Sequence, residues 1–167
     1  AIDNENRLWV AGYNGYGNLG DGTTGDKWTF TKLITIEEVA EVSASTANST
    51  IALLLDGTVW GFGNNTNYGL ANVGGAIPQQ LQTQEGMLEN VTSISEGVYS
   101  GYAVTGEEKV VAWGLNNYGQ LATGNNETKN VAVYMQDKDG NDFTDVMLIS
   151  GGVYSAQVAK NDGTVWS

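Results

Sequence analysis

The chain has 167 residues, 41% of them hydrophobic, and a formal net charge of −12 from 7 basic and 19 acidic residues. The absence of Cys and His excludes disulfides, thiol catalysis, imidazole metal ligands and a Ser-His-Asp hydrolase. The negative charge opposes binding to nucleic-acid phosphates, and no apolar run reaches the ~20 residues that a membrane-spanning helix needs.

Short strand-forming segments alternate with glycine-rich loops from the start of the chain. A run that carries an aromatic residue closes at Gly12, and residues 13–22 are rich in Gly and Asn. Asp56-Gly57 lies between two β-prone runs, which predicts a type I′ hairpin because that turn needs positive φ at both central residues. The expected strands of this first unit are Leu8–Gly12, Trp28–Leu33, Val39–Val42 and Thr50–Leu55.

The same order of segments recurs about every 51 residues, since aromatic runs close at Gly12, Gly63 and Gly114 and another copy begins at Val165-Trp166. A period of this length without helical patterning is typical of a β-propeller or a related β array, and four antiparallel strands make one blade. We therefore predict an all-β fold of about three four-stranded blades, either an open arc of a propeller or an array completed by other chains. The approximate repeats are 7–57, 58–108 and 109–163, and residues 164–167 start a further copy.

The later copies differ in detail. Gly106–Lys109 stands where Asp-Gly is found elsewhere and predicts a longer or different turn. The fourth strand of each unit is the least regular, and we place it near Gln80–Thr83 and Val131–Gln136 in the second and third copies. The other expected strands are Val59–Gly63, Val91–Ile94, Gly101–Thr105, Val111–Gly114, Val146–Ile149 and Ser155–Ala159.

Two residue types recur with the repeat. An asparagine follows each closing glycine by two residues, and because Asn side chains bond nearby backbone groups we expect these to hold buried turns. The recurring tryptophans are expected to be core packing. The asparagines are Asn14, Asn65 and Asn116, and the tryptophans are Trp9, Trp60, Trp113 and Trp166.

The combined pattern is aromatic-x-Gly-x-Asn-x-Tyr-Gly-Gln/Asn-Leu, a Val-x-x-Ile strand, Gly-x-x-x-Ser and Asp-Gly-Thr-Val-Trp, and it is most specific over residues 113–121. It resembles the regulator of chromosome condensation repeat, and the resemblance implies a seven-bladed propeller. Seven units would need roughly 360 residues, so we expect an excerpt of a longer protein or an assembly with further repeats. The family commonly has His before the Ser of the turn, and its replacement here by Asn48, Tyr99 and Tyr154 suggests a divergent, prokaryotic branch.

The predicted function is a non-enzymatic binding or structural scaffold that is extracellular or displayed on the cell surface. Its expected partner is a protein or a carbohydrate, with no nucleic acid, no membrane insertion and no cofactor. Loops carry recognition on such scaffolds, and tyrosine offers an amphipathic ring for it, although packing within the loop is an alternative role. The candidate binding residues are Tyr13, Tyr16, Tyr68, Tyr118 and Asn117.

Two other functions stay open. A glycan-active enzyme could use two carboxylates without His, but no candidate lies in a recurrent or apolar context that would tune its pKa. Guanine-nucleotide exchange is the other alternative, and it follows only from the resemblance to the repeat family. The carboxylates considered are Asp21, Asp26, Glu96 and Asp142.

The segment 137–142 has the closely spaced acids of a calcium loop, but it has no Glu at the position that would give bidentate ligation. A plain hairpin turn around Gly140 is the other interpretation. We predict no metal site, with calcium as the alternative. Its ligands would be Asp137, Asp139, Asn141 and Asp142.

Overall fold

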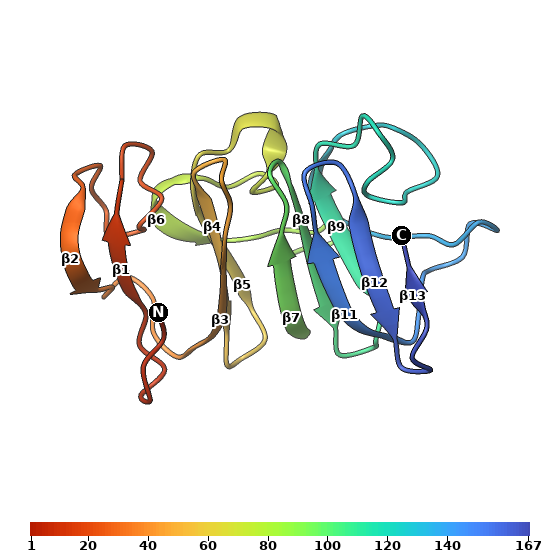
Figure 1. Ribbon diagram of the computed structural model, residues 1–167, viewed down its shortest axis with the longest axis horizontal. Coiled ribbons are helices and arrows are strands. Elements are labelled where there is room, and N and C mark those ends of the chain that lie inside the picture. Colours follow the sequence, from red (N-terminus) through yellow and green to blue (C-terminus); the bar gives the residue numbers. More distant parts are fainter.

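The computed structural model describes residues 1–167 as four antiparallel sheets arranged in a row, with no α-helix (Figure 1). The first sheet has two strands, the second and third have four each, and the last has three. This confirms the predicted all-β fold with blades of four antiparallel strands. No helix is long and apolar enough to cross a membrane.

The strands follow the chain from one sheet to the next. The first sheet holds β1 (Trp9–Gly12) and β2 (Lys27–Lys32). The second holds β3 (Val39–Ala44), β4 (Ser49–Leu54), β5 (Val59–Gly63) and β6 (Gly75–Gln80), with a 3₁₀ turn η1 (Thr66–Tyr68) between β5 and β6. The third holds β7 (Val91–Glu96), β8 (Ser100–Thr105), β9 (Val110–Gly114) and β10 (Lys129–Tyr134), and the last holds β11 (Val146–Gly151), β12 (Ala156–Lys160) and β13 (Val165–Trp166).

The strand β6 lies earlier than Gln80–Thr83, where the sequence placed it. It contains Gly75 and Pro78, which disfavour a strand in a sequence-based assignment. Because β6 is at the edge of its sheet, a proline that cannot donate a hydrogen bond is tolerated there.

The hairpin turns differ from the predicted types in two places. Gly57 has φ of 83° but Asp56 is not left-handed, so the predicted type I′ turn is wrong. Glu108 has φ of 59°, and its N–H donates to the carbonyl of Thr105 at 2.9 Å, as the N–H of Gly57 does to Leu54 at 3.0 Å. The two turns therefore share one hydrogen-bonding pattern, and the different turn expected at 106–109 is wrong, because Glu108 adopts the left-handed backbone of a glycine.

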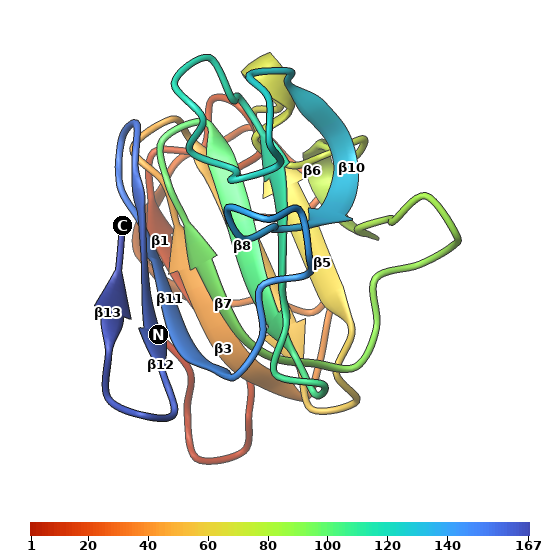
Figure 2. The ribbon, with the colours of Figure 1, turned by 90° about the vertical axis from the view of Figure 1, so that its right-hand side faces the viewer.

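The core lies between the sheets rather than inside any one of them. Each sheet contributes one face to a cluster with its neighbour, and both faces of the second and third sheets are covered. This double coverage explains why all six residues of β8 are buried, where a one-sided sheet would alternate. The inner strands β3, β7 and β11 follow one another from back to front in Figure 2, with the outer strands β6 and β10 on one side.

Polar bonds also connect the inner strands. The hydroxyl of Ser43 on β3 accepts the backbone N–H of Glu96 on β7 at 3.1 Å. One sheet further, the hydroxyl of Ser95 accepts the N–H of Gly151 on β11 at 3.0 Å. Ser43 and Ser95 occupy equivalent positions in β3 and β7, and each bonds its own strand to the inner strand of the next sheet.

Only one tryptophan is fully in the core. Trp113 is 0% exposed, whereas Trp60 is half-buried and Trp166 is 54% exposed. Trp113 comes one residue before the closing glycine of its strand. Phe62 has this position in β5, and its side chain is also 0% exposed. The prediction of four equivalent core tryptophans is therefore wrong in part, because Trp113 and Trp60 occupy different positions of the repeat.

Candidate functional site

The loops of all four sheets meet at one end of the molecule, the upper end in Figure 1. We call this the loop end, and it consists of residues 13–26, 45–48, 64–74, 97–99, 115–128 and 152–155. The opposite end, which we call the turn end, carries the tight turns between the second and third strands of the sheets. It consists of residues 3–7, 37–38, 54–58, 89–90, 105–109, 145 and 160–164.

A recurring asparagine holds each long loop in shape. In the three copies the side-chain oxygen of this asparagine accepts a backbone N–H five residues later at 2.9 Å, and the amide nitrogen donates to a loop carbonyl. This confirms the predicted structural role and explains how irregular backbone is satisfied without a ladder. The pairs are Asn14 with Leu19, Asn65 with Leu70 and Asn116 with Leu121.

The predicted tyrosines all lie on the loop end with exposed rings. Tyr13 and Tyr16 form an edge-to-face pair with ring centroids 6.3 Å apart. The ring of Tyr13 lies over Gly15, where a Cβ would come within 2.1 Å of the Tyr13 hydroxyl, so the ring is positioned by its own loop. Tyr68 belongs to η1, and Tyr118 is the most exposed of the four at 72%.

The structure adds residues that sequence reasoning missed. Tyr154 in the β11–β12 turn lies against Tyr118, with ring centroids 4.9 Å apart. Tyr99 takes the same place in the β7–β8 turn, next to Gly69 of the loop that begins with η1. The nearly identical segments at 97–100 and 152–155 were the available signal, but in the sequence they indicated only a turn. Asn117 is exposed beside Tyr118.

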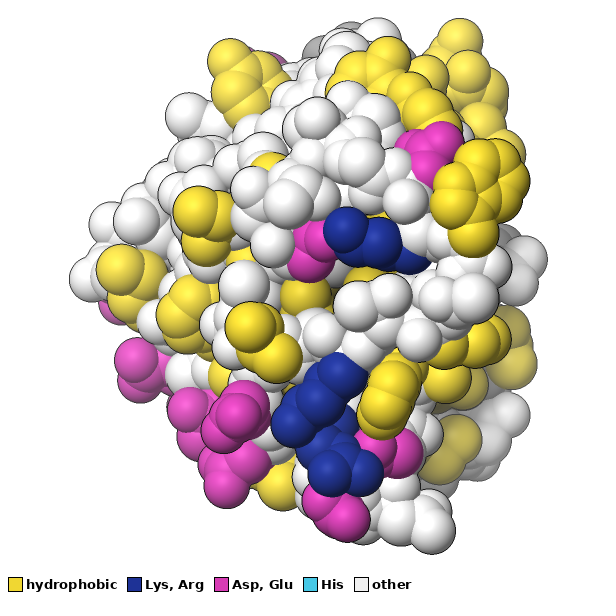
Figure 3. Space-filling model, turned by 90° about the vertical axis from the view of Figure 1, so that its left-hand side faces the viewer, with side chains coloured by type: hydrophobic (Ala, Val, Ile, Leu, Met, Phe, Trp, Pro, Cys, Tyr) yellow, Lys and Arg dark blue, Asp and Glu magenta, His cyan; other side chains and the backbone are white.

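Charge is distributed unevenly between the two ends. The loop end holds three acidic residues, and two of them pair with lysines at the adjoining strand starts, Asp21 with Lys27 at 2.7 Å and Glu127 with Lys129 at 3.1 Å. The turn end holds ten acidic residues and three basic ones, Arg7, Lys109 and Lys160, so seven negative charges are left in excess there (10 − 3). Figure 3 shows the acidic side chains of one flank mainly in its lower half. These ten are Asp3, Glu5, Glu37, Glu38, Asp56, Glu89, Glu107, Glu108, Asp145 and Asp162.

Two of the carboxylates considered for catalysis, Asp21 and Asp26, both accept hydrogen bonds from Asn14. Partial burial opposes ionisation of Asp21, but hydrogen bonds from Lys27, Thr23 and Asn14 outweigh it and lower its pKa to about 2. Asp26 accepts the N–H of Asn14 at 2.8 Å. Because its pKa is lowered, Asp21 is a poor general acid at neutral pH.

Glu96 contradicts the expectation that no carboxylate lies in a context that tunes its pKa. It is 9% exposed, its Oε1 is hydrogen-bonded to the hydroxyl of Ser49 in the neighbouring sheet, and its Oε2 has no partner. Burial raises its pKa to about 8, although the Ser49 bond opposes this shift. Because the carboxyl group is sealed between two sheets, it has no access to a substrate.

The segment proposed as a calcium alternative forms a turn. Asp137 Oδ1 accepts the backbone N–H of Asp139 at 2.8 Å and that of Asn141 at 2.9 Å, while Lys138 pairs with Asp139 and Lys109 with Asp142. No group of three or more acidic side chains is arranged to hold a metal ion. The carboxylates of this segment are therefore engaged in turn geometry and ion pairs.

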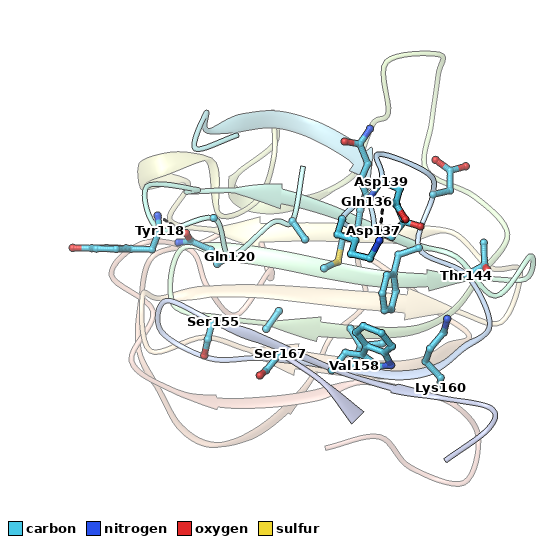
Figure 4. Close-up of a pocket in the computed structure, with 18 residues that line it drawn as sticks. Tyr118, Gln120, Gln136, Asp137, Asp139, Thr144, Ser155, Val158, Lys160 and Ser167 are labelled. Carbon is cyan, nitrogen blue, oxygen red and sulfur yellow. Dashed lines mark hydrogen bonds and ion pairs between the residues drawn. The ribbon is translucent and has the colours of Figure 1, made fainter. Parts of the chain in front are cut away.

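A cavity of about 550 Å³ opens on the flank of the last sheet (Figure 4). Its apolar lining includes Met135, Phe143 and Val158, with Tyr118 at one end and Lys160 at the other. At the two preceding sheet–sheet contacts the corresponding space is filled by Phe62 and Trp113, which pack against the loop of the preceding sheet. The cavity therefore resembles a packing space between blades more than a ligand pocket.

Comparison with known proteins gives consistent matches. Residues 39–69 match the family model described as the regulator of chromosome condensation (RCC1) repeat. The chain is 35% identical over 120 residues to the RCC1 domain-containing protein RUG3, mitochondrial, of Arabidopsis thaliana. The aligned region covers 70% of this chain and 26% of that protein. It is 26% identical over 165 residues to the regulator of chromosome condensation of Mus musculus, covering 96% of this chain and 39% of that protein.

Solved structures show the same fold. Human WBSCR16 superposes with a TM-score of 0.77 at 22% identity and covers 98% of this chain and 43% of its own. Prp20p of Saccharomyces cerevisiae, a protein that binds Gsp1p and histones, superposes with a TM-score of 0.75 at 17% identity, covering 96% of this chain and 41% of its own. The chain thus spans from 26% to 43% of the length of these proteins.

The expected extracellular or cell-surface location is wrong. One relative is named as mitochondrial, and others are named for the condensation of chromosomes. The composition misled because an acidic, cysteine-free chain is equally compatible with the reducing interior of a cell. The family model over residues 39–69, the relatives and the shared fold agree in showing that this chain is similar to proteins built from regulator of chromosome condensation repeats.

Proposed function

We propose that the chain is part of a non-enzymatic propeller scaffold that binds a protein through its loop end. The observation that carries this proposal is the set of exposed tyrosines on loops whose backbone is held by buried asparagines. Rigid rings with few rotatable bonds give contact area at low entropic cost, and Tyr, Ser, Gly and Asn are the residues that antibody loops use in the same way. The site residues are Tyr13, Tyr16, Tyr68, Tyr118 and Asn117, to which we add Tyr154.

A protein partner is favoured over a carbohydrate because a protein with the same fold binds other proteins. Prp20p is described with binding to Gsp1p and histones, and in another structure it is bound to Kap60. The net charge of −12 supports the expectation that nucleic acid is not the ligand. Guanine-nucleotide exchange rests on family resemblance alone, and nothing in the geometry of this chain favours it.

We also propose that further repeats cover the two outer sheets and complete a seven-bladed ring. Trp28 is 93% and Phe30 65% exposed on the first sheet, and Leu148 and Trp166 are half-exposed on the last. Large apolar side chains exposed in this way on the two outer sheets favour a further element that covers them. The repeat boundaries at 57, 108 and 163 and the prokaryotic branch stay predictions.

Peptide display tests the binding proposal without a known partner. A library of random twelve-residue peptides on phage is selected against the immobilised chain. We expect peptides that bind the wild type, lose binding to the double variant Tyr16→Ala with Tyr118→Ala, and keep binding to Tyr134→Ala. Tyr134 is the matched control because it is 45% exposed but lies on the outer strand β10.

Two outcomes contradict the proposal. Binding that is equally retained by the loop-end variant and the control would place the site elsewhere. A loop-end variant that unfolds would show that the rings pack the loop, and circular dichroism of each variant distinguishes this case.

A further inference from the structure

The loop end is nearly uncharged although the chain as a whole is strongly acidic. We propose that the segment it binds is an uncharged polypeptide stretch, recognised by tyrosine rings and amide groups, and not the basic segment that a net charge of −12 would attract. This inference rests on the proposed function and names the chemistry of the partner at that same site.

The loop end carries almost no net charge. Two of the three acids of the loop end are neutralised by the lysines described above. The third, Asp26, uses Oδ1 to accept the backbone N–H of Asn14 at 2.8 Å, and its single negative charge is the one that the ion pairs leave at this end. The remaining exposed polar side chains carry hydroxyls and amides, as in Asn67 and Asn117, and Val153 adds an exposed apolar side chain.

The acids of the turn end lie far from the loop end. The central strands β4 and β8 have six residues each, which at about 3.3 Å per residue separates the two ends by about 20 Å. The Debye length at physiological ionic strength is about 8 Å, so the ten acids of the turn end are more than two Debye lengths away. Their field is therefore largely screened where the tyrosines lie.

The geometry of the rings also suits an uncharged partner. Tyr118 and Tyr154 come from different sheets and form one tilted pair, and Tyr13 with Tyr16 form a second pair on the first sheet. Aromatic faces flanked by amides suit apolar side chains and peptide backbone of a partner, since each ring gives both apolar area and a hydroxyl. A guanidinium or ammonium group would meet few carboxylates here to offset its desolvation.

The test sorts peptides by charge. Three twelve-residue phage libraries are selected at 150 mM NaCl, one lacking Lys, Arg, Asp and Glu, one enriched in Lys and Arg, and one enriched in Asp and Glu. We expect the uncharged library to give peptides whose Kd changes less than about threefold between 20 and 500 mM NaCl. The affinity of these peptides should fall at least about tenfold for the variant Tyr118→Ala. It should not change for the turn-end double variant that combines Glu37→Lys and Glu107→Lys.

Each other outcome is decisive. Basic peptides that depend on Tyr118 would overturn the neutral-partner inference and leave the proposed function standing. Basic peptides that ignore Tyr118 but are lost with Glu37→Lys and Glu107→Lys would overturn both. Acidic peptides, or no enrichment from any library, would also overturn the inference.

Discussion

A carboxyl group is buried between the second and third sheets. Its titration should dominate the pH dependence of the free energy of unfolding between pH 5 and pH 8. Glu96 ends β7 and is 9% exposed. Its Oε1 is hydrogen-bonded to Ser49 on β4, its backbone N–H donates to Ser43 on β3, and its Oε2 is buried without a partner. The equivalent positions in the neighbouring sheets hold Ala44 and Gly151, which bring no charge into this space.

The sign follows from the direction of the pKa shift. Burial raises the pKa of Glu96 from 4.5 to about 8, so the folded protein holds a proton that the unfolded chain releases. The stabilisation is fully present below pH 4.5 and is lost as the pH rises through 8. From these two pKa values the free energy of unfolding should fall by about 3 kcal/mol between pH 5 and pH 8.

Glu96→Gln removes this titration while keeping the shape of the side chain. Urea unfolding at pH 5, 6, 7 and 8, followed by tryptophan fluorescence, to which the buried Trp113 contributes, measures the free energy of unfolding. We expect the wild type to lose about 3 kcal/mol across this range and the variant to lose less than about 1 kcal/mol. Glu107→Gln, at an exposed position of the turn end, is the control and should keep the wild-type pH dependence.

One result would refute the reasoning: Glu96→Gln with the same pH dependence as the wild type. The lowered pKa of Asp21 does not interfere with the range used. Its stabilisation is present above the unfolded value of 3.8 and is lost only as the pH falls through about 2.

Three further predictions concern stability, each measured by urea unfolding at pH 6. Asn116→Ala leaves the N–H of Leu121 without its acceptor and should destabilise by about 2–3 kcal/mol; a loss under about 0.5 kcal/mol would show that water replaces the side chain. Glu108→Gly relieves a left-handed backbone with φ of 59° and should stabilise by about 1 kcal/mol, and a destabilised variant would contradict this. Trp113→Ala removes a fully buried ring and should cost about 3–5 kcal/mol, whereas Trp28→Ala, at 93% exposure, should change stability by less than about 0.5 kcal/mol; similar losses would contradict the assigned burial.

The sequence determined the period, most of the strands and the role of the recurring asparagines. These features depend on interactions within a few residues, such as the bond from Asn116 to the N–H of Leu121 five positions on. Because each local pattern occurs in several copies of the repeat, a pattern that arose by chance in one copy can be recognised and set aside. The hairpin at Glu108 escaped prediction because a left-handed residue other than Gly or Asn leaves no signal in the sequence.

The tertiary structure decided what depends on neighbouring sheets. Glu96 looks like any acidic residue of a strand end, and it is buried only because β3 and β4 of the preceding sheet close over it. The pairing of Tyr118 with Tyr154 and the separation of a nearly uncharged end from an acidic one likewise depend on the tertiary structure, because every second connection of an antiparallel sheet lies at the same edge and the sheets stack with these edges side by side. Local pattern specifies each strand and turn, but burial and charge environment are properties of the contact between sheets.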